Sequence, residues 1–494
     1  MPHGDNIMRR LLIGLVLLSA ASSCGNDETA AGSGGAGASG GSGGTGCTGA
    51  YAYVSRYSAD QSSVSHSGQA WRHVAILDLT SRIEGLTDRI EKNELQPDAG
   101  KVVAELDFFL RFNPDNGNQP VAFLSDQALK QKTYDDISKD KNLIDKLAGS
   151  DTSTDHKVWN DGTAFVGAPG AASPAALVDA WFAEIEQNAI DHANAPRKGP
   201  DDVALPVHVT ADGRDLAELV QKFVTGAVAF SQGTDDYLDD DVADKGLLSP
   251  NTRDGDSPYT VLEHAWDEGF GYFGASHAYP SYTDEELAGK GGRPEYLAGY
   301  HDTSCDGALD LASEVNFGHS VNAGKRDFGS AESAKTDLTK DAWEAFAEGR
   351  SVIAAAKGDA LTADELGKLK EARDRAVLAW EESIAATVVH YINDVLKDMG
   401  KMGSADYSFT GHAGHWSELK GFALVLQFNP RKKISDADFA SLHEKVGMAP
   451  VLEAEGKAAL DGYKQKLIEA RALLAAAYGF APANVGDSDG KNGW

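Results

Sequence analysis

TADELGKLKEARDRAVLAWEESIAATVVHYINDVLKDM, residues 362–399, is the stretch that decides the fold. Its apolar residues return at intervals of three and four, as one face of a helix requires. This stripe consists of Leu369, Ala376, Leu378, Ala379, Ile384, Val388, Ile392 and Leu396. The segment opens with Thr-Ala-Asp-Glu, a combination typical of helix starts. We therefore predict one long helix over residues 362–399.

Other segments of the chain show the same helical rhythm. In residues 68–91, apolar positions recur from Trp71 to Ile90. Ser173 followed by Pro174 predicts a capped helix with proline in its first turn. Further helices are predicted over residues 215–230, 258–273, 341–356, 415–428 and 450–478.

Strand signals are few. Residues 101–112 are mixed in pattern, and residues 203–210 form only a short candidate. The predicted fold class is therefore all-α. The connections between the predicted helices are rich in Gly, Pro and Asp and longer than a minimal bundle needs, and long loops often line functional surfaces.

The N-terminal residues predict a lipoprotein signal. Two arginines precede the apolar run LLIGLVLLSAASS, which leads directly into Cys24. The run is shorter than the ~20 apolar residues that a membrane-spanning helix needs. We predict that residues 1–23 are a signal peptide and that Cys24 becomes the lipidated N-terminus, which anchors the protein to a membrane. An ordinary cleaved signal peptide is the alternative.

The segment after the lipidation site predicts a tether. Residues 24–50 consist of the cysteine and a linker built almost entirely of Gly, Ser, Ala and Thr, a composition typical of flexible chain. Gly25 stands where an aspartate would retain the protein in the inner membrane. We therefore expect the outer membrane of a Gram-negative bacterium, on a face that the sequence does not specify.

The charge and the cysteines restrict the partners. The chain has 45 Lys and Arg against 75 Asp and Glu, a formal net charge of -30. Such a surface repels nucleic acid and anionic lipid headgroups, so no nucleic-acid partner is expected. Outside the signal, Cys47 and Cys305 could form a disulfide in an oxidising compartment, although Cys47 lies in the linker.

Two segments resemble each other. EHAWDEGFGYF at residues 263–273 is echoed by GHWSELKGFAL at residues 414–424. Both place an acid three residues after a histidine, followed by a glycine and a phenylalanine. The similarity predicts a duplicated helical bundle with one repeat in residues 51–300 and the other in residues 301–494.

The second of these segments carries candidate metal ligands. His415 and Glu418 are three residues apart, so both side chains lie on one helix face. Imidazole and carboxylate groups together are common ligands for iron, zinc or manganese. His412 lies one turn earlier, and His390 with Asp394 lies on the preceding helix. Facing helices of a bundle can deliver such groups to one interior point.

The first segment offers a similar set. His264 and Asp267 are candidates for a second, pseudo-symmetric site, with Glu268 next to them. A histidine and an acid at this spacing can also be a hydrogen-bonded structural pair, or an acid placed against the helix dipole. The sequence leaves the choice between ligand and structural pair open.

Four blocks of sequence resemble a known family. They are SVSHSGQAWRHVAILDL at residues 63–79, HAWDEGFGYFG at residues 264–274, ATVVHYINDV at residues 386–395 and HWSELKGFALVLQFNP at residues 415–430. Together they resemble a family of bacterial lipoproteins catalogued as a domain of unknown function, which is distantly similar to the imelysins. The resemblance extends over residues 51–481.

The likeness to imelysins implies an all-α fold of two related bundles, a cell-envelope location and a link to iron-regulated uptake. Imelysins carry a GxHxxE motif, first interpreted as a metallopeptidase site and later doubted as such. His415 and Glu418 take the places of its histidine and glutamate. The glycine does not match, because Gly414 adjoins the histidine.

Three functions follow from these observations. The first is a lipid-anchored envelope protein that binds a metal ion, iron or another divalent metal, or a metal-bearing ligand such as haem, in iron acquisition with an envelope transport partner. His415 and Glu418 would be ligands, completed by His412 or His390. The second is an interaction or adaptor lipoprotein without a metal. The third is a metallopeptidase in which Glu418 acts as general base for a metal-bound water.

Overall fold

The computed structural model describes residues 50–149, 165–200 and 202–494 of the chain, and its regular elements are helices. Among these residues, β-structure is limited to isolated bridges. The predicted all-α class is confirmed. The α-helices are α1 (Ser67–Glu84), α2 (Leu86–Glu91), α3 (Lys101–Leu110), α4 (Tyr134–Ile137), α5 (Pro174–Asn194), α6 (Leu216–Thr225), α7 (Val261–Phe273), α8 (Asp284–Leu287), α9 (Gly318–Phe328), α10 (Leu338–Ala355), α11 (Ala363–Lys401), α12 (Phe409–Val425), α13 (Asp436–Val446), α14 (Lys457–Tyr478) and α15 (Pro482–Val485).

Helix α11 is the long helix that the sequence predicts. It has 39 residues, and its start is closed by a capping box in which Thr362 and Glu365 each accept a hydrogen bond from the other's backbone N–H. The predicted apolar stripe is buried except for Leu378, which is 39% exposed. The prediction was wrong for Leu378 because this residue lies about 200° around the helix from Ala376, on the outer face.

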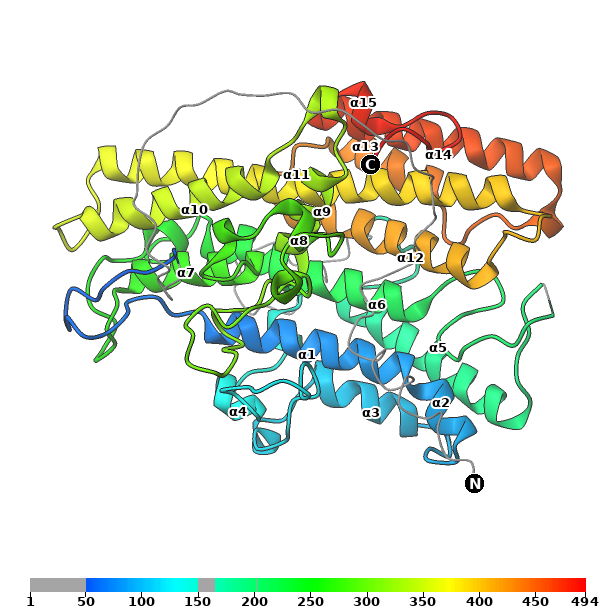
Figure 1. The fold of residues 1–494 in the computed structure, drawn as a ribbon, viewed down its shortest axis with the longest axis horizontal. Helices are drawn as coiled ribbons and strands as arrows, with labels where there is room; N and C mark the ends of the chain where they lie inside the picture. Colours follow the sequence, from blue (N-terminus) through cyan, green and yellow to red (C-terminus); the bar gives the residue numbers. More distant parts are fainter. Residues whose placement is uncertain (1–49, 150–164, 201) are drawn as a thin grey trace.

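The long helices run along the long axis of the molecule and stack in layers (Figure 1). Helix α11 packs against α10, α12 and α14. Helix α12 packs in turn on α6, α6 on α1, and α1 on α3. The side chains of α12 are therefore held between α11 and α6.

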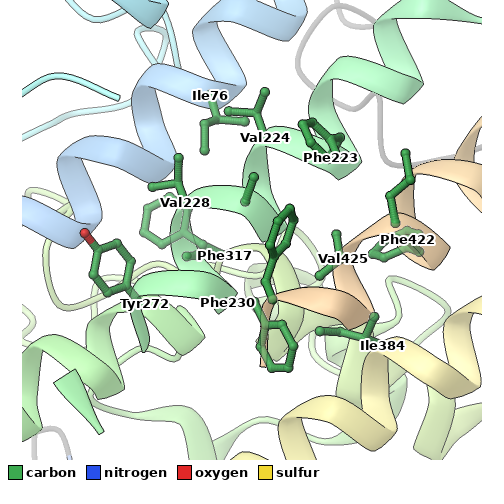
Figure 2. Packing of buried hydrophobic residues seen from close by; sticks show 14 of the residues in the cluster. Ile76, Phe223, Val224, Val228, Phe230, Tyr272, Phe317, Ile384, Phe422 and Val425 are labelled. Carbon is green, nitrogen blue, oxygen red and sulfur yellow. The ribbon is translucent and has the colours of Figure 1, made fainter. Parts of the chain in front are cut away.

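One cluster of buried apolar side chains extends from Tyr51 to Trp494. Figure 2 shows part of this cluster, in which Ile76 of α1 lies beside Val224 of α6, and Val425 of α12 lies near Ile384 of α11. Each fully buried aliphatic side chain of this size contributes about 1.5–3 kcal/mol of transfer free energy. This apolar packing fixes the helices that also carry the polar residues described below.

Residues 101–112, which are mixed in their sequence pattern, form helix α3 and not a strand. Val102, Leu106 and Leu110 are fully buried on one face at four-residue spacing. The start of α3 is capped from outside, because the carboxylate of Glu186 in α5 accepts hydrogen bonds from three backbone N–H groups there. This cap comes from a residue more than 80 positions away, so the local pattern does not reveal it.

Several boundaries also differ from the sequence expectation. The helix predicted over residues 68–91 is divided at Gly85 into α1 and α2. The helix predicted from residue 415 begins earlier, at Phe409, because the Ser408 hydroxyl accepts a hydrogen bond from a backbone N–H of the first turn. Residues 203–210 form only isolated bridges. Helices α9 and α13 were not predicted.

Within the described residues, no helix has both the length and the apolar character that a membrane crossing requires. The predicted signal peptide, Cys24 and the linker up to residue 49 lie outside the described residues.

The two similar segments lie in α7 and α12. Both helices begin with a side-chain cap, from Thr260 and Ser408 respectively. Helix α7 packs against α1 and α10, whereas α12 packs against α6 and α11. The duplication of residues 51–300 and 301–494 stays a prediction.

The contact between α7 and α10 allows a packing test. Gly349 of α10 lies against the buried indole of Trp266, and a Cβ at this position would overlap the ring. We expect Gly349→Ala to lower the free energy of unfolding by about 1–3 kcal/mol, the usual effect of overpacking a core. Urea denaturation followed by circular dichroism measures this change.

The control is Gly367→Ala in α11, where a Cβ would meet no atom within 4 Å. Alanine favours a helix over glycine by up to about 1 kcal/mol, so this variant is expected to gain stability. A stabilised Gly349→Ala protein would contradict the close packing of α7 on α10.

Candidate functional site

Glu418 lies at the centre of a buried group of charges where α12 meets α6 and α11. It is 6% exposed, and its Oε1 accepts a hydrogen bond of 2.5 Å from the Tyr391 hydroxyl of α11. The Lys222 ammonium of α6 lies 3.3 Å from the same oxygen and 2.7 Å from Oε2 of Glu218. Three helices therefore contribute to one ion-paired group.

The protonation of this group depends on burial and on the pairing of its charges. Burial and the neighbouring Glu218 carboxylate raise the pKa of Glu418, although Lys222 and Tyr391 oppose the shift. For Lys222, burial favours the neutral amine, but Glu218 and Glu418 together outweigh it and raise the pKa of Lys222. The ammonium stays charged and offsets the two glutamates.

His415 also faces α11. Its Nδ1 lies 2.6 Å from Oδ2 of Asp398, and the two side chains are 15% and 9% exposed. Burial opposes the imidazolium, but the hydrogen bond to Asp398 and the nearby Asp394 carboxylate outweigh it and raise the pKa of His415. The hydrogen-bond partner of His415 Nδ1 is therefore a carboxylate of the protein itself.

His390 lies one residue before Tyr391 on α11. Its Nε2 is 3.2 Å from Oδ2 of Asp394, and its Nδ1 is buried without a hydrogen-bond partner among the described residues. Burial and the positive charge of Arg326 lower the pKa of His390 to about 3, so the ring is neutral at physiological pH. Asp394 is also paired with Lys397 at 3.0 Å.

His412 contacts a different residue. It is 1% exposed, and its Nδ1 lies 3.1 Å from the Tyr407 hydroxyl at the start of α12. Burial lowers the pKa of His412 to about 4. The structure therefore brings His390, His415 and Glu418 together around Tyr391, while His412 is engaged with Tyr407.

Two cations of α9 also belong to this neighbourhood and were missed by the sequence analysis. Arg326 is 6% exposed, and its guanidinium is close enough to Tyr391, Asp394 and Glu418 to interact electrostatically with each. Lys325 is half-buried, and its pKa is lowered by burial and by the charge of Lys222, whereas the charge of Glu418 raises it. The only sequence signal was two adjacent basic residues in a segment that was not predicted to be a helix.

We call this group the central polar cluster. Its members come from α6, α9, α11 and α12, which pack on one another at this point. The central polar cluster consists of Glu218, Lys222, Lys325, Arg326, His390, Tyr391, Asp394, Asp398, His415 and Glu418.

The candidates of the first segment, His264 and Asp267, lie in a hydrogen-bond network of their own. His264 Nδ1 lies 3.0 Å from the Ser65 carbonyl oxygen, and its ring stacks on Tyr259. Asp267 is fully buried and accepts hydrogen bonds of 2.9 Å from both Tyr51 and Arg350. The other oxygen of Asp267 accepts a hydrogen bond of 3.3 Å from the Ser65 backbone N–H, so both side chains contact Ser65 while Tyr51 and Arg350 contact Asp267 alone.

Arg350 of α10 is the centre of that second environment. It is fully buried and donates to Asp267 at 2.9 Å, Glu263 at 3.0 Å and the Ser63 hydroxyl at 2.7 Å. Burial raises the pKa of Asp267 to about 6, against the opposing charge of Arg350. This network connects α7, α10 and the segment from Tyr51 to Ser63, and it stabilises their packing.

Over residues 50–149, 165–200 and 202–494, no group of three or more His, Cys, Asp or Glu side chains is arranged to hold a metal ion. Cys305 is disulfide-bonded. Its predicted pairing with Cys47 stays a prediction, because Cys47 lies outside the described residues, as does Cys24.

An acidic loop near Cys305 was also missed by the sequence analysis. Asp302 accepts backbone hydrogen bonds at 2.8 and 3.3 Å, and Glu314 accepts them at 2.6 and 2.8 Å. The Lys130 ammonium lies 2.6 Å from Asp306 and 3.9 Å from Asp310. Lys130 therefore pairs with two of the four acids of the loop, which borders a surface cavity of about 420 Å³.

Residues 201–481, more than half of the 494, match the family described as Domain of unknown function (DUF4856). The matched range includes every member of the central polar cluster. No curated protein and no solved structure matches the chain. The expectation of a family without assigned function is confirmed, and the chain belongs to the family Domain of unknown function (DUF4856).

Proposed function

We propose that this chain is a lipid-anchored protein of the bacterial cell envelope that binds a metal-bearing ligand or a metal ion in iron acquisition. The observation that carries the proposal is that three candidate residues, His390, His415 and Glu418, lie around Tyr391 in the central polar cluster. Cys24 supplies the anchor in this proposal, and the outer membrane is the proposed location.

The contacts of the cluster favour a metal-bearing ligand over a bare ion. A bare ion at Glu418 would have to displace Tyr391 and Lys222, and at His415 it would have to displace Asp398. It would also meet the positive charges of the cluster. A chelated metal already has its own donor atoms, so the protein needs to supply only charges and hydrogen bonds.

The same contacts argue against the metallopeptidase. A general base must reach the water that it activates, within about 2.6–3.2 Å or through one further water. In Glu418, one oxygen is held by Tyr391 and Lys222, and the carboxylate is 6% exposed. Binding is therefore the better supported activity.

The distant likeness to imelysins agrees with this proposal and adds two elements to it. One is the arrangement as two related bundles, and the other is a transport partner in the envelope that receives the ligand. The charge of -30 supports a partner that is not a nucleic acid.

A thermal-shift experiment tests the proposed function. The full-length protein, purified in detergent, is heated with ferric citrate, haem, or ferrous, zinc or manganese ions. A ligand that binds only the folded state stabilises it by about 2.7 kcal/mol at a hundredfold excess over the Kd, which raises the Tm by several degrees. We expect this rise with ferric citrate or haem, and we expect His415→Asn to reduce the affinity at least tenfold.

The matched control is His264→Asn. His264 is also a half-buried histidine of the repeated segment, but it lies outside the central polar cluster. It is expected to bind the ligand like the wild type. Unchanged melting with every metal species, in all three proteins, would favour the adaptor function. The pairing of Glu418 Oε1 with Tyr391 and of His415 Nδ1 with Asp398 also supports that function.

A further inference from the structure

We propose that Arg326 and Lys325 bind the anionic end of the ligand, a carboxylate or phosphate group, in the central polar cluster. This inference rests on the proposed function and names the chemical class of its ligand. Both residues lie in the last turns of α9, which packs against α8, α10 and α11 (Figure 1).

The first argument is the unused hydrogen-bonding capacity of Arg326. The residue is 6% exposed, and its Nε–H has no hydrogen-bond partner among the described residues. Its backbone is held in place, because the Trp494 indole donates a hydrogen bond of 2.9 Å to the Arg326 carbonyl oxygen. A buried guanidinium without a partner is costly, and a bound anion removes that cost.

The second argument is the distribution of pairs in the cluster. Glu418 has Tyr391 and Lys222 as direct partners, and Asp394 has His390 and Lys397. Arg326 and Lys325 add only longer-range attraction to Glu418 and, for Arg326, to Asp394. For these two cations, no ion pair forms within the described part of the chain.

The third argument is the chemistry of the donors. The guanidinium fork of arginine matches the two oxygens of a carboxylate or phosphate, and a neighbouring ammonium adds a point charge. A small molecule with more than one acidic group fits this set, which agrees with a carboxylate chelator around a metal.

Calorimetric titration of the full-length protein with citrate, and separately with inorganic phosphate, tests the assignment. We expect at least one of these anions to bind the wild type at millimolar concentration. Arg326→Gln is expected to weaken that binding by about tenfold or more, the loss of a charge-assisted hydrogen-bonded pair. The Tm of the ligand-free variant is expected to stay level or to rise, because an unpaired buried charge is removed.

Two further variants complete the test. Lys325→Gln, at a half-buried position, is expected to weaken the binding of the same anion as well. The matched control is Arg375→Gln, which removes an arginine that is 50% exposed and paired with Glu348, and it is expected to bind within twofold of the wild type. The anion that binds more tightly distinguishes a carboxylate ligand from a phosphate ligand.

Two results would overturn the inference. One is the absence of binding of both anions to the wild type. The other is that wild type and Arg326→Gln bind citrate or phosphate with equal affinity. If ferric citrate still bound both proteins, the proposed function would remain intact. Conversely, the wild type could bind citrate equally well with and without iron, and Arg326→Gln could lose this binding. That result would support the anion site and remove the metal from the proposed function.

Discussion

Replacement of Arg350 by methionine is expected to lower the free energy of unfolding by about 3–5 kcal/mol, the effect of removing one partner from a buried ion pair. Arg350 is fully buried and is the cation that Glu263 and Asp267 share. Without it, Asp267 keeps the Tyr51 hydroxyl but loses the charge that opposes its burial. The pKa of Asp267, already raised to about 6 by burial, is expected to rise further.

Urea denaturation of the wild type and of Arg350→Met measures this loss. The control is Arg375→Met, whose ion pair with Glu348 is about half exposed and is expected to contribute at most about 1 kcal/mol. Adding Asp267→Asn to Arg350→Met removes the acid that has lost its cation, whereas Glu263 keeps Arg56 at 3.4 Å, and is expected to restore part of the stability. A loss below about 1 kcal/mol in Arg350→Met would refute the role of the network.

The opposite sign is expected for Lys420→Met. Lys420 is 3% exposed, and its ammonium contacts only the Gly447 carbonyl oxygen at 2.8 Å and His443 Nδ1 at 3.2 Å among the described residues. Burial lowers the pKa of Lys420 from 10.5 to about 7. Methionine fills a similar volume without a charge, so the variant is expected to be more stable by about 2–4 kcal/mol at pH 6, where each pKa unit corresponds to ~1.4 kcal/mol.

The pH dependence follows from the direction of this shift. Above pH 10.5, the amine is neutral in the folded and the unfolded chain, so it does not affect stability. As the pH falls from 10.5 to 7, the lysine is protonated in the unfolded chain but still neutral in the folded chain, so the free energy of unfolding decreases. Below pH 7 the lysine is protonated in both states, and the decrease has reached its full size. The gain from Lys420→Met is therefore expected to be largest below pH 7 and to fall below about 1 kcal/mol at pH 10.

Denaturation curves at pH 6, 8 and 10 measure that gain. The control is Lys457→Met, because Lys457 has a side chain that is 86% exposed, and this variant is expected to change stability little at each pH. If Lys420→Met were less stable than the wild type at pH 6, the hydrogen bond to Gly447 would outweigh the cost of burying the charge.

The sequence by itself determined the fold class and the central helix. A period of three and four residues is a local property, and the capping box at Thr362 and Glu365 joins residues three apart. It also placed His415 and Glu418 on one face of α12, because helix geometry relates such neighbours directly. The membership in a family without assigned function was likewise readable from the sequence.

Only the tertiary structure decided which charges meet. His264 and Asp267 both contact the Ser65 backbone, but Arg350 donates to Asp267, from α10 and 83 residues away. Arg326 and Lys325 enter the central polar cluster because α9, which no sequence pattern predicted, packs against α11. The start of α3 is likewise set by Glu186 from α5. Burial of a charged group and the choice of its partner depend on which helices pack together, and this information is absent from any single helical period.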